Sequence, residues 1–190
     1  MRKLFHVVLL LGLLLAVSPA AAENRHIMQR YSFNEQGLLS THLTIDFGYD
    51  IKTPQVEKIS MGGDRSLLLI TFPLTGDRIF TLPLFNSLTY SIYKANLRDS
   101  SYEELVVFGL GKVEGISVQV REVCIIGLNQ AGEISAMPVK NFSQSKVRNV
   151  PMQLDGRRNI MLSADKSGRT YYIYWDPVAG EFAAGDRPLN

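Results

Sequence analysis

Beyond residue 22, short apolar runs alternate with polar turns along most of the chain. The runs are rich in Val, Ile, Tyr, Phe and Thr, and Gly, Asn, Asp or Pro interrupts them roughly every eight to twelve residues. This pattern predicts an all-β fold of antiparallel strands and hairpins, arranged as a sandwich or as an incomplete propeller-like structure. The strands are predicted over His26–Phe33, Leu39–Phe47, Val56–Ser60, Ser66–Pro73, Arg78–Leu84, Thr89–Asn96, Glu104–Phe108, Ile116–Leu128, Glu133–Val139, Val150–Leu154, Asn159–Ala164, Thr170–Trp175 and Glu181–Ala184.

Four of the polar turns have the composition that reverses a chain between antiparallel neighbours. They are Asn34–Gly37, Thr75–Asp77, Asn129–Gly132 and Asp176–Gly180, and each supplies Gly, Asn or Asp. We therefore expect a hairpin at each of the four.

The first twenty-two residues have the three zones of a secretory signal peptide. Positive Arg2 and Lys3 precede an apolar run over residues 4–17, and Ala20–Ala22 gives a small-x-small cleavage site. The run is shorter than the about twenty residues that a membrane span needs. We expect cleavage after Ala22 and a secreted or periplasmic protein. An uncleaved N-terminal anchor is the alternative.

Loss of the signal peptide changes the charge of the chain. The 20 Lys and Arg fall to 18 without Arg2 and Lys3, against 18 Asp and Glu, so the mature chain is formally neutral. A neutral chain without a basic run gives no support to nucleic acid or an anionic membrane as partner. The remaining 168 residues, 190 minus 22, fit a single β domain over 23–190.

Cysteine and histidine are too few for a structural zinc site. Cys124 is the single cysteine, and only His26 and His42 remain after signal cleavage, whereas zinc takes four ligands. Cys124 lies in an apolar run, which predicts an inert core thiol; an intermolecular disulfide is the alternative. The sequence predicts no metal and no cofactor. Asn141 begins an N-glycosylation sequon, which is used only in a eukaryotic host.

Two patterns in the sequence are candidates for catalytic chemistry. His42 and Asp46 share one face of a predicted strand, where an Asp orients an imidazole in hydrolases, but no nucleophile motif accompanies them. A solvent-facing polar stripe explains the same residues.

Paired carboxylates would serve glycoside hydrolysis. The carboxylates available for such a pair are Asp46, Asp50, Glu103, Glu104 and Asp155. Surface solubility is the simpler account of these groups.

One loop with its following strand carries a family resemblance. Residues 95–107 read A-N-L-R-D-S-S-Y-E-E-L-V-V, which resembles an FG-GAP-type, integrin-like propeller repeat of the form A-D-F-N-G-D-G-Y-D-D-L-V-V. The family's calcium-holding positions correspond to Asn96, Arg98, Ser100 and Glu104. Arg98 places a cation where an oxygen ligand belongs, and Ser100 replaces a carboxylate. The resemblance therefore implies a scaffold rather than a calcium site.

The aromatic run 171–175, Y-Y-I-Y-W, gives the candidate binding residues. Strand alternation places Tyr171, Ile173 and Trp175 on one face, and Tyr172 and Tyr174 on the other. One face must be core, so the other is free to stack on a sugar ring or on an apolar partner surface. Tyrosines that only cover a sheet edge are the alternative.

These observations favour an exported, non-enzymatic β module that binds a protein or a glycan through Tyr172 and Tyr174 in the envelope or extracellular space. A secreted carboxylate-dependent hydrolase and a structural envelope component are the rival functions.

Overall fold

The computed structural model describes residues 28–47, 54–72, 78–98, 100–112, 115, 119–147, 153–163 and 168–188. The predicted signal peptide and the turn predicted at Thr75–Asp77 lie outside the described residues. The elements are β1 (Gln29–Ser32), β2 (Gln55–Gly62), β3 (Arg65–Phe72), β4 (Arg78–Leu84), β5 (Leu88–Ala95), β6 (Glu104–Gly111), β7 (Val120–Leu128), β8 (Ile134–Lys140), the 3-10 helix η2 (Gln144–Lys146), β9 (Gln153–Leu154), β10 (Ile160–Ser163), β11 (Thr170–Asp176) and β12 (Glu181–Gly185).

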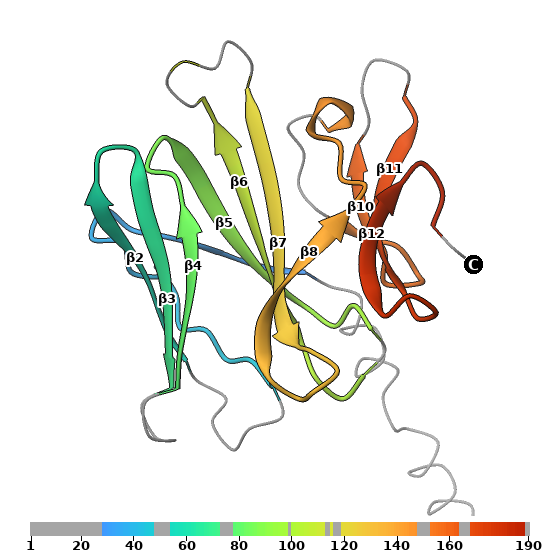
Figure 1. Ribbon diagram of the computed structural model, residues 1–190, viewed down its shortest axis with the longest axis horizontal. Helices are drawn as coiled ribbons and strands as arrows, with labels where there is room; N and C mark the ends of the chain where they lie inside the picture. Colours follow the sequence, from blue (N-terminus) through green and yellow to red (C-terminus); the bar gives the residue numbers. More distant parts are fainter. Residues whose placement is uncertain are drawn as a thin grey trace, which may run out of the picture.

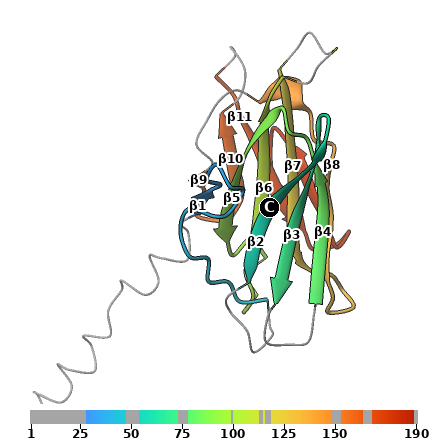
Figure 2. The same ribbon diagram turned by 90° about the vertical axis from the view of Figure 1, so that its left-hand side faces the viewer.

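The strands form two sheets, which confirms the predicted all-β class. Nine strands follow the order β1-β5-β6-β7-β8-β12-β11-β10-β9, and β2-β3-β4 form a separate three-stranded sheet. The larger sheet curls into a half-barrel (Figure 1), and the smaller one lies beside its β5–β7 part (Figure 2). Neighbours pair antiparallel except β8 and β12, which are parallel.

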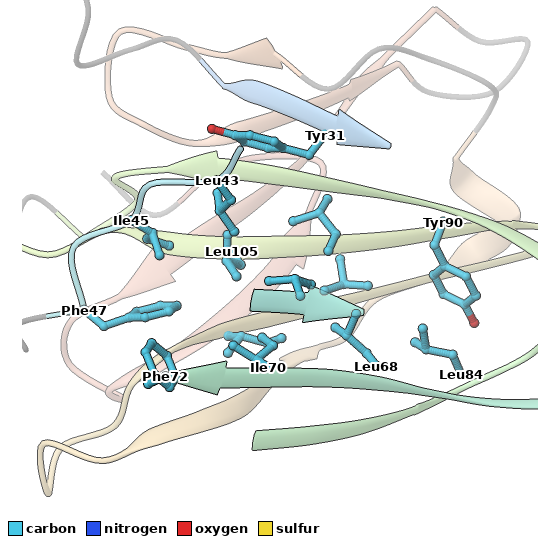
Figure 3. Packing of buried hydrophobic residues seen from close by; sticks show 14 of the residues in the cluster. Tyr31, Leu43, Ile45, Phe47, Leu68, Ile70, Phe72, Leu84, Tyr90 and Leu105 are labelled. Carbon is cyan, nitrogen blue, oxygen red and sulfur yellow. The ribbon is translucent and has the colours of Figure 1, made fainter. Parts of the chain in front are cut away.

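Two hydrophobic clusters lie on opposite faces of β5, β6 and β7. In β6, Leu105 and Val107 belong to the cluster facing β2–β4, and Val106 and Phe108 to the cluster facing β10–β12. Figure 3 shows the first cluster, with Leu105 among its labelled residues. Because both faces of β6 are buried, its sequence E-L-V-V-F-G-L-G is almost continuously apolar instead of alternating.

The predicted strand Leu39–Phe47 is wrong. Among the described residues of this segment, only Leu39 forms a bridge, to Phe33. Leu43, Ile45 and Phe47 are nevertheless buried in the first cluster, as Figure 3 shows. Alternating burial requires an extended chain over a core, but it does not require a partner strand.

The main chain of this extended segment bonds partly to a side chain instead of to a ladder. The Glu103 amide donates to the Asp46 carbonyl at 2.8 Å, and the Asp46 amide donates to Glu103 Oε2 at 3.0 Å. Buried backbone groups need some partner, and a carboxylate supplies one here.

The described turns reverse the chain where the sequence predicts. Asn129 Oδ1 accepts the amides of Ala131 and Glu133 between β7 and β8, and Asp176 Oδ1 accepts those of Val178 and Ala179 between β11 and β12. These are the local side-chain bonds that favour Asn and Asp in turns. At the first turn, Gly37 has φ +80°, and an added Cβ would lie 2.1 Å from the Lys58 carbonyl oxygen.

Candidate site on the outer face of the C-terminal strands

Strand β11 separates its aromatic side chains between core and surface. Tyr171 and Ile173 are each 1% exposed in the second cluster, and Trp175 packs against that cluster. Tyr172 and Tyr174 lie on the opposite face and are half-buried. The alternation along the strand therefore places them where the sequence pattern does, and their binding role stays a prediction.

Small residues of β12 lie next to the two tyrosines. Tyr172 pairs with Gly185, and Tyr174 pairs with Ala183. A Cβ built at Gly185 would be 3.9 Å from the Tyr174 ring, which is ordinary contact distance. Directly opposite residues share one face of a sheet, so the tyrosine rings lie beside the small residues of β12.

The hydroxyl groups of this pair differ from those of the buried tyrosines. The Tyr171 hydroxyl donates to the Asn141 carbonyl at 2.8 Å and accepts the Ser143 amide at 2.9 Å. In the described part of the chain, the Tyr172 and Tyr174 hydroxyls have no hydrogen-bond partner. Each of them is thus free to donate to a ligand and to accept from one.

An ion pair lies next to the two tyrosines on the same side of the sheet, towards β8. Lys140 pairs with Ala183 across the parallel seam, and its Nζ lies 2.7 Å from Glu181 Oε1. The hydrogen bond that Lys140 donates to the Glu181 carboxylate raises the pKa of Lys140. Exposed ion pairs contribute little to stability, so this pair is more important as a polar rim. We call Tyr172, Tyr174, Ala183, Gly185, Lys140 and Glu181 the tyrosine face.

A hollow of about 540 Å³ opens beside this rim, and Pro138, Lys140, Glu181 and Phe182 are among its lining residues. It lies where β8 and β12 stop pairing, since the register joins only Val139 to Phe182 and Lys140 to Ala183. Pro138 has no amide hydrogen to donate to a ladder, which explains why the parallel seam begins at the next residue.

The loop that resembles a propeller repeat is built around an arginine. Glu104 is 0% exposed, and its carboxylate accepts Arg98 Nε at 2.6 Å and the Leu97 amide at 2.8 Å. Arg158 reaches the same loop and donates to Asn96 Oδ1 at 2.7 Å. The cation that faces Glu104 is thus a guanidinium, and the family resemblance itself stays a prediction.

The other candidate carboxylates are distributed over separate local structures. Asp155 Oδ1 accepts the amides of Arg157 and Asn159 in its own turn. Glu103 bonds the Asp46 segment, and Asp50 lies outside the described residues. Among the described residues, no three His, Cys, Asp or Glu gather in a way that could hold a metal ion.

His42 is exposed and Asp46 is half-buried at the edge of the first cluster. Asn141 is exposed at the end of β8.

Cys124 is half-buried and is a free thiol. Burial raises the pKa of this thiol to about 11, with a smaller contribution from Glu122. A search of the described residues for an apolar helix of membrane-spanning length found none.

Comparisons with protein-family models, with curated proteins and with solved structures found no match to this chain. Strand alternation in the sequence predicts the outward position of the two tyrosines, but it gives no sign of Lys140, Glu181 or the hollow at the seam. Lys140 and Glu181 are 41 positions apart, and no local pattern connects them.

Proposed function

We propose that this chain is an exported β module without catalytic activity and that it binds a glycan or a protein through the tyrosine face. The single observation that carries the proposal is the half-buried Tyr172 and Tyr174 pair beside Ala183 and Gly185, with both hydroxyls free of partners in the described residues. Flat amphipathic rings give large contact area at low entropic cost, which suits recognition surfaces.

The binding function is favoured over the hydrolase because three of the five candidate carboxylates already have structural roles. Glu104 is neutralised by Arg98, Asp155 holds its own turn and Glu103 holds the Asp46 amide. A general acid or a nucleophile must instead face the substrate.

Export rests on the charge, apolar and small-residue zones of residues 1–22. Mass measurement of the exported species tests it: we expect a chain that begins at Glu23. Recovery of only the intact Met1 form in membranes would contradict export.

Affinity capture with a matched set of variants tests the tyrosine face. Immobilised mature protein is exposed to fractionated envelope and culture fluid, and Tyr172→Ser/Tyr174→Ser is compared with Tyr102→Ser. Tyr102 is a suitable control because it is 38% exposed on the separate loop before β6. Loss of two aromatic anchors is expected to weaken capture by about tenfold or more, and the control should bind normally.

Treatment of the captured material separates the two partner classes. Periodate destroys binding by a glycan, and protease digestion destroys binding by a protein. If the double tyrosine variant captures the same material with unchanged affinity, the tyrosine face is not the binding site.

A further inference from the structure

A second pocket, separate from the tyrosine face, lies where two hairpin turns meet. The β7–β8 turn supplies Gln130 and the β11–β12 turn supplies Gly180. A Cβ built at Gly180, which has φ +66°, would lie 2.3 Å from Gln130 Nε2. The pocket has a volume of about 370 Å³, within the range of roughly 300–1,000 Å³ that is usual for small-molecule sites. It is lined by Arg98, Asn129, Gln130, Ala131, Met137, Trp175 and Gly180.

Arg98 is fixed in this pocket by three contacts. Its Nε donates to Glu104 Oε1 at 2.6 Å, one terminal nitrogen donates to the Leu128 carbonyl at 2.7 Å, and the guanidinium lies 5.3 Å from the centre of the Trp175 ring. The arginine side chain is only 14% exposed. Since its position is set by the protein, a ligand would meet a preorganised donor and would not have to order it.

Two polar groups of the pocket are left to bind a ligand. The second terminal nitrogen of Arg98 and the side-chain amide of Gln130 have no hydrogen-bond partner in the described residues. Gly127 lies beside the first of these, since a Cβ there would be 3.4 Å from that nitrogen. Asn129 is different, since its Oδ1 already accepts two turn amides.

The chemistry of the lining selects the kind of ligand. Arg98 is the only charged residue among the described lining residues, and Glu104 neutralises it, so the pocket has little net charge. An unpaired amide both donates and accepts, as sugar hydroxyls do, while Trp175 and Met137 offer apolar contact for C–H groups. A neutral polyol ring satisfies both kinds of surface. An anion would have to compete with the Glu104 carboxylate.

We infer that the pocket between the Asn129–Gly132 and Asp176–Gly180 turns binds one pyranose ring of a neutral glycan, with Arg98 and Gln130 bonding its hydroxyls and Trp175 contacting its ring. The six residues of the tyrosine face do not line this pocket, although the hollow beside that face shares Met137 and Gly180 with it.

The only tryptophan in the sequence, Trp175, reports on this pocket directly. Glucose, N-acetylglucosamine, cellobiose and sodium glucuronate are titrated separately into the mature protein while tryptophan emission is recorded. We expect a saturable change with at least one neutral sugar. No saturable change with any neutral sugar up to its solubility, or a change with glucuronate alone, would overturn the inference.

Variants locate the binding. Gln130→Ala is expected to weaken the sugar roughly two- to tenfold, the range for one lost hydrogen bond. Val178→Ala is the control, because Val178 is 97% exposed on the same hairpin and does not line the pocket. Trp175→Phe, followed by calorimetry, should weaken binding more strongly. If Gln130→Ala, Val178→Ala and Trp175→Phe all bind the sugar with equal affinity, the sugar binds elsewhere. A loss of affinity only in Tyr172→Ser/Tyr174→Ser would lead to the same conclusion.

Discussion

Replacement of Arg98 by methionine removes the countercharge of a fully buried carboxylate while it keeps most of the apolar stem. Glu104 is 0% exposed, and after the change only the Leu97 amide at 2.8 Å still bonds its carboxylate among the contacts described here. Removal of one partner from a buried ion pair costs about 3–5 kcal/mol, because the other charge stays buried without compensation. We expect Arg98→Met to lower the free energy of unfolding at pH 7 by that amount.

The assay is urea-induced unfolding followed by far-UV circular dichroism, since Arg98 lies over Trp175 and the substitution would alter its fluorescence. The pH dependence of the loss in unfolding free energy distinguishes an electrostatic effect of Arg98→Met from a packing effect. Burial raises the pKa of Glu104, against the lowering effects of the Leu97 amide and Arg98. In the wild type, the stability associated with this raised pKa is therefore present below the unfolded pKa of about 4.3 and is lost as pH rises through the folded value.

Arg98→Met removes a group that lowers the pKa of Glu104, so the pKa rises further. The stability difference between variant and wild type should then be small below pH 4 and should grow as pH rises to 7. A double variant, Arg98→Met/Glu104→Leu, should be more stable at pH 7 than Arg98→Met, because no charge is left buried. A pH-independent loss, or a loss under about 1 kcal/mol at pH 7, would refute this reasoning.

Two further predictions concern the interior. An Ala Cβ at Gly109 would lie 2.6 Å from Tyr90 Cε1 and 2.9 Å from Glu122 Cγ, so we expect Gly109→Ala to cost roughly 1–3 kcal/mol in thermal or urea unfolding. Gly156→Ala, with no atom within 4 Å, is the control, and equal effects would contradict the clash. Because the Cys124 thiol pKa is about 11, roughly one thiol in a thousand is ionised at pH 8. Iodoacetamide should label it slowly in the native protein and rapidly in urea, whereas equal rates would show an accessible thiol.

Local sequence patterns were sufficient to predict much of the fold. The strands were predictable because one-sided burial gives period-two alternation, and Asn and Asp mark turns through bonds to nearby amides, as Asn129 does. The same alternation placed Tyr172 and Tyr174 away from Tyr171 and the core. It failed at Leu43–Phe47, where a segment without strand pairing also buries every second side chain.

Contacts between distant parts of the chain had no comparable signal in the local sequence. The parallel seam consists of two register pairs between strands about forty residues apart, and it joins β1 and β5–β8 to β9–β12 in one sheet. The pocket between the hairpin turns joins residues far apart in the sequence, since Gln130 lies against Gly180. Arg98 and Glu104 were visible in the sequence as a cation and a carboxylate in one loop, but burial of their pair depends on β7 and β11 packing around them.

Hydrogen–deuterium exchange of the mature protein, with and without the captured partner fraction, tests the tyrosine face most directly. Binding there should slow exchange in peptides that cover β11, β12 and the end of β8, while β2–β4 on the opposite side of the molecule keep their rates (Figure 1). Slower exchange confined to β2–β4, with β11 and β12 unchanged, would contradict the proposed binding surface.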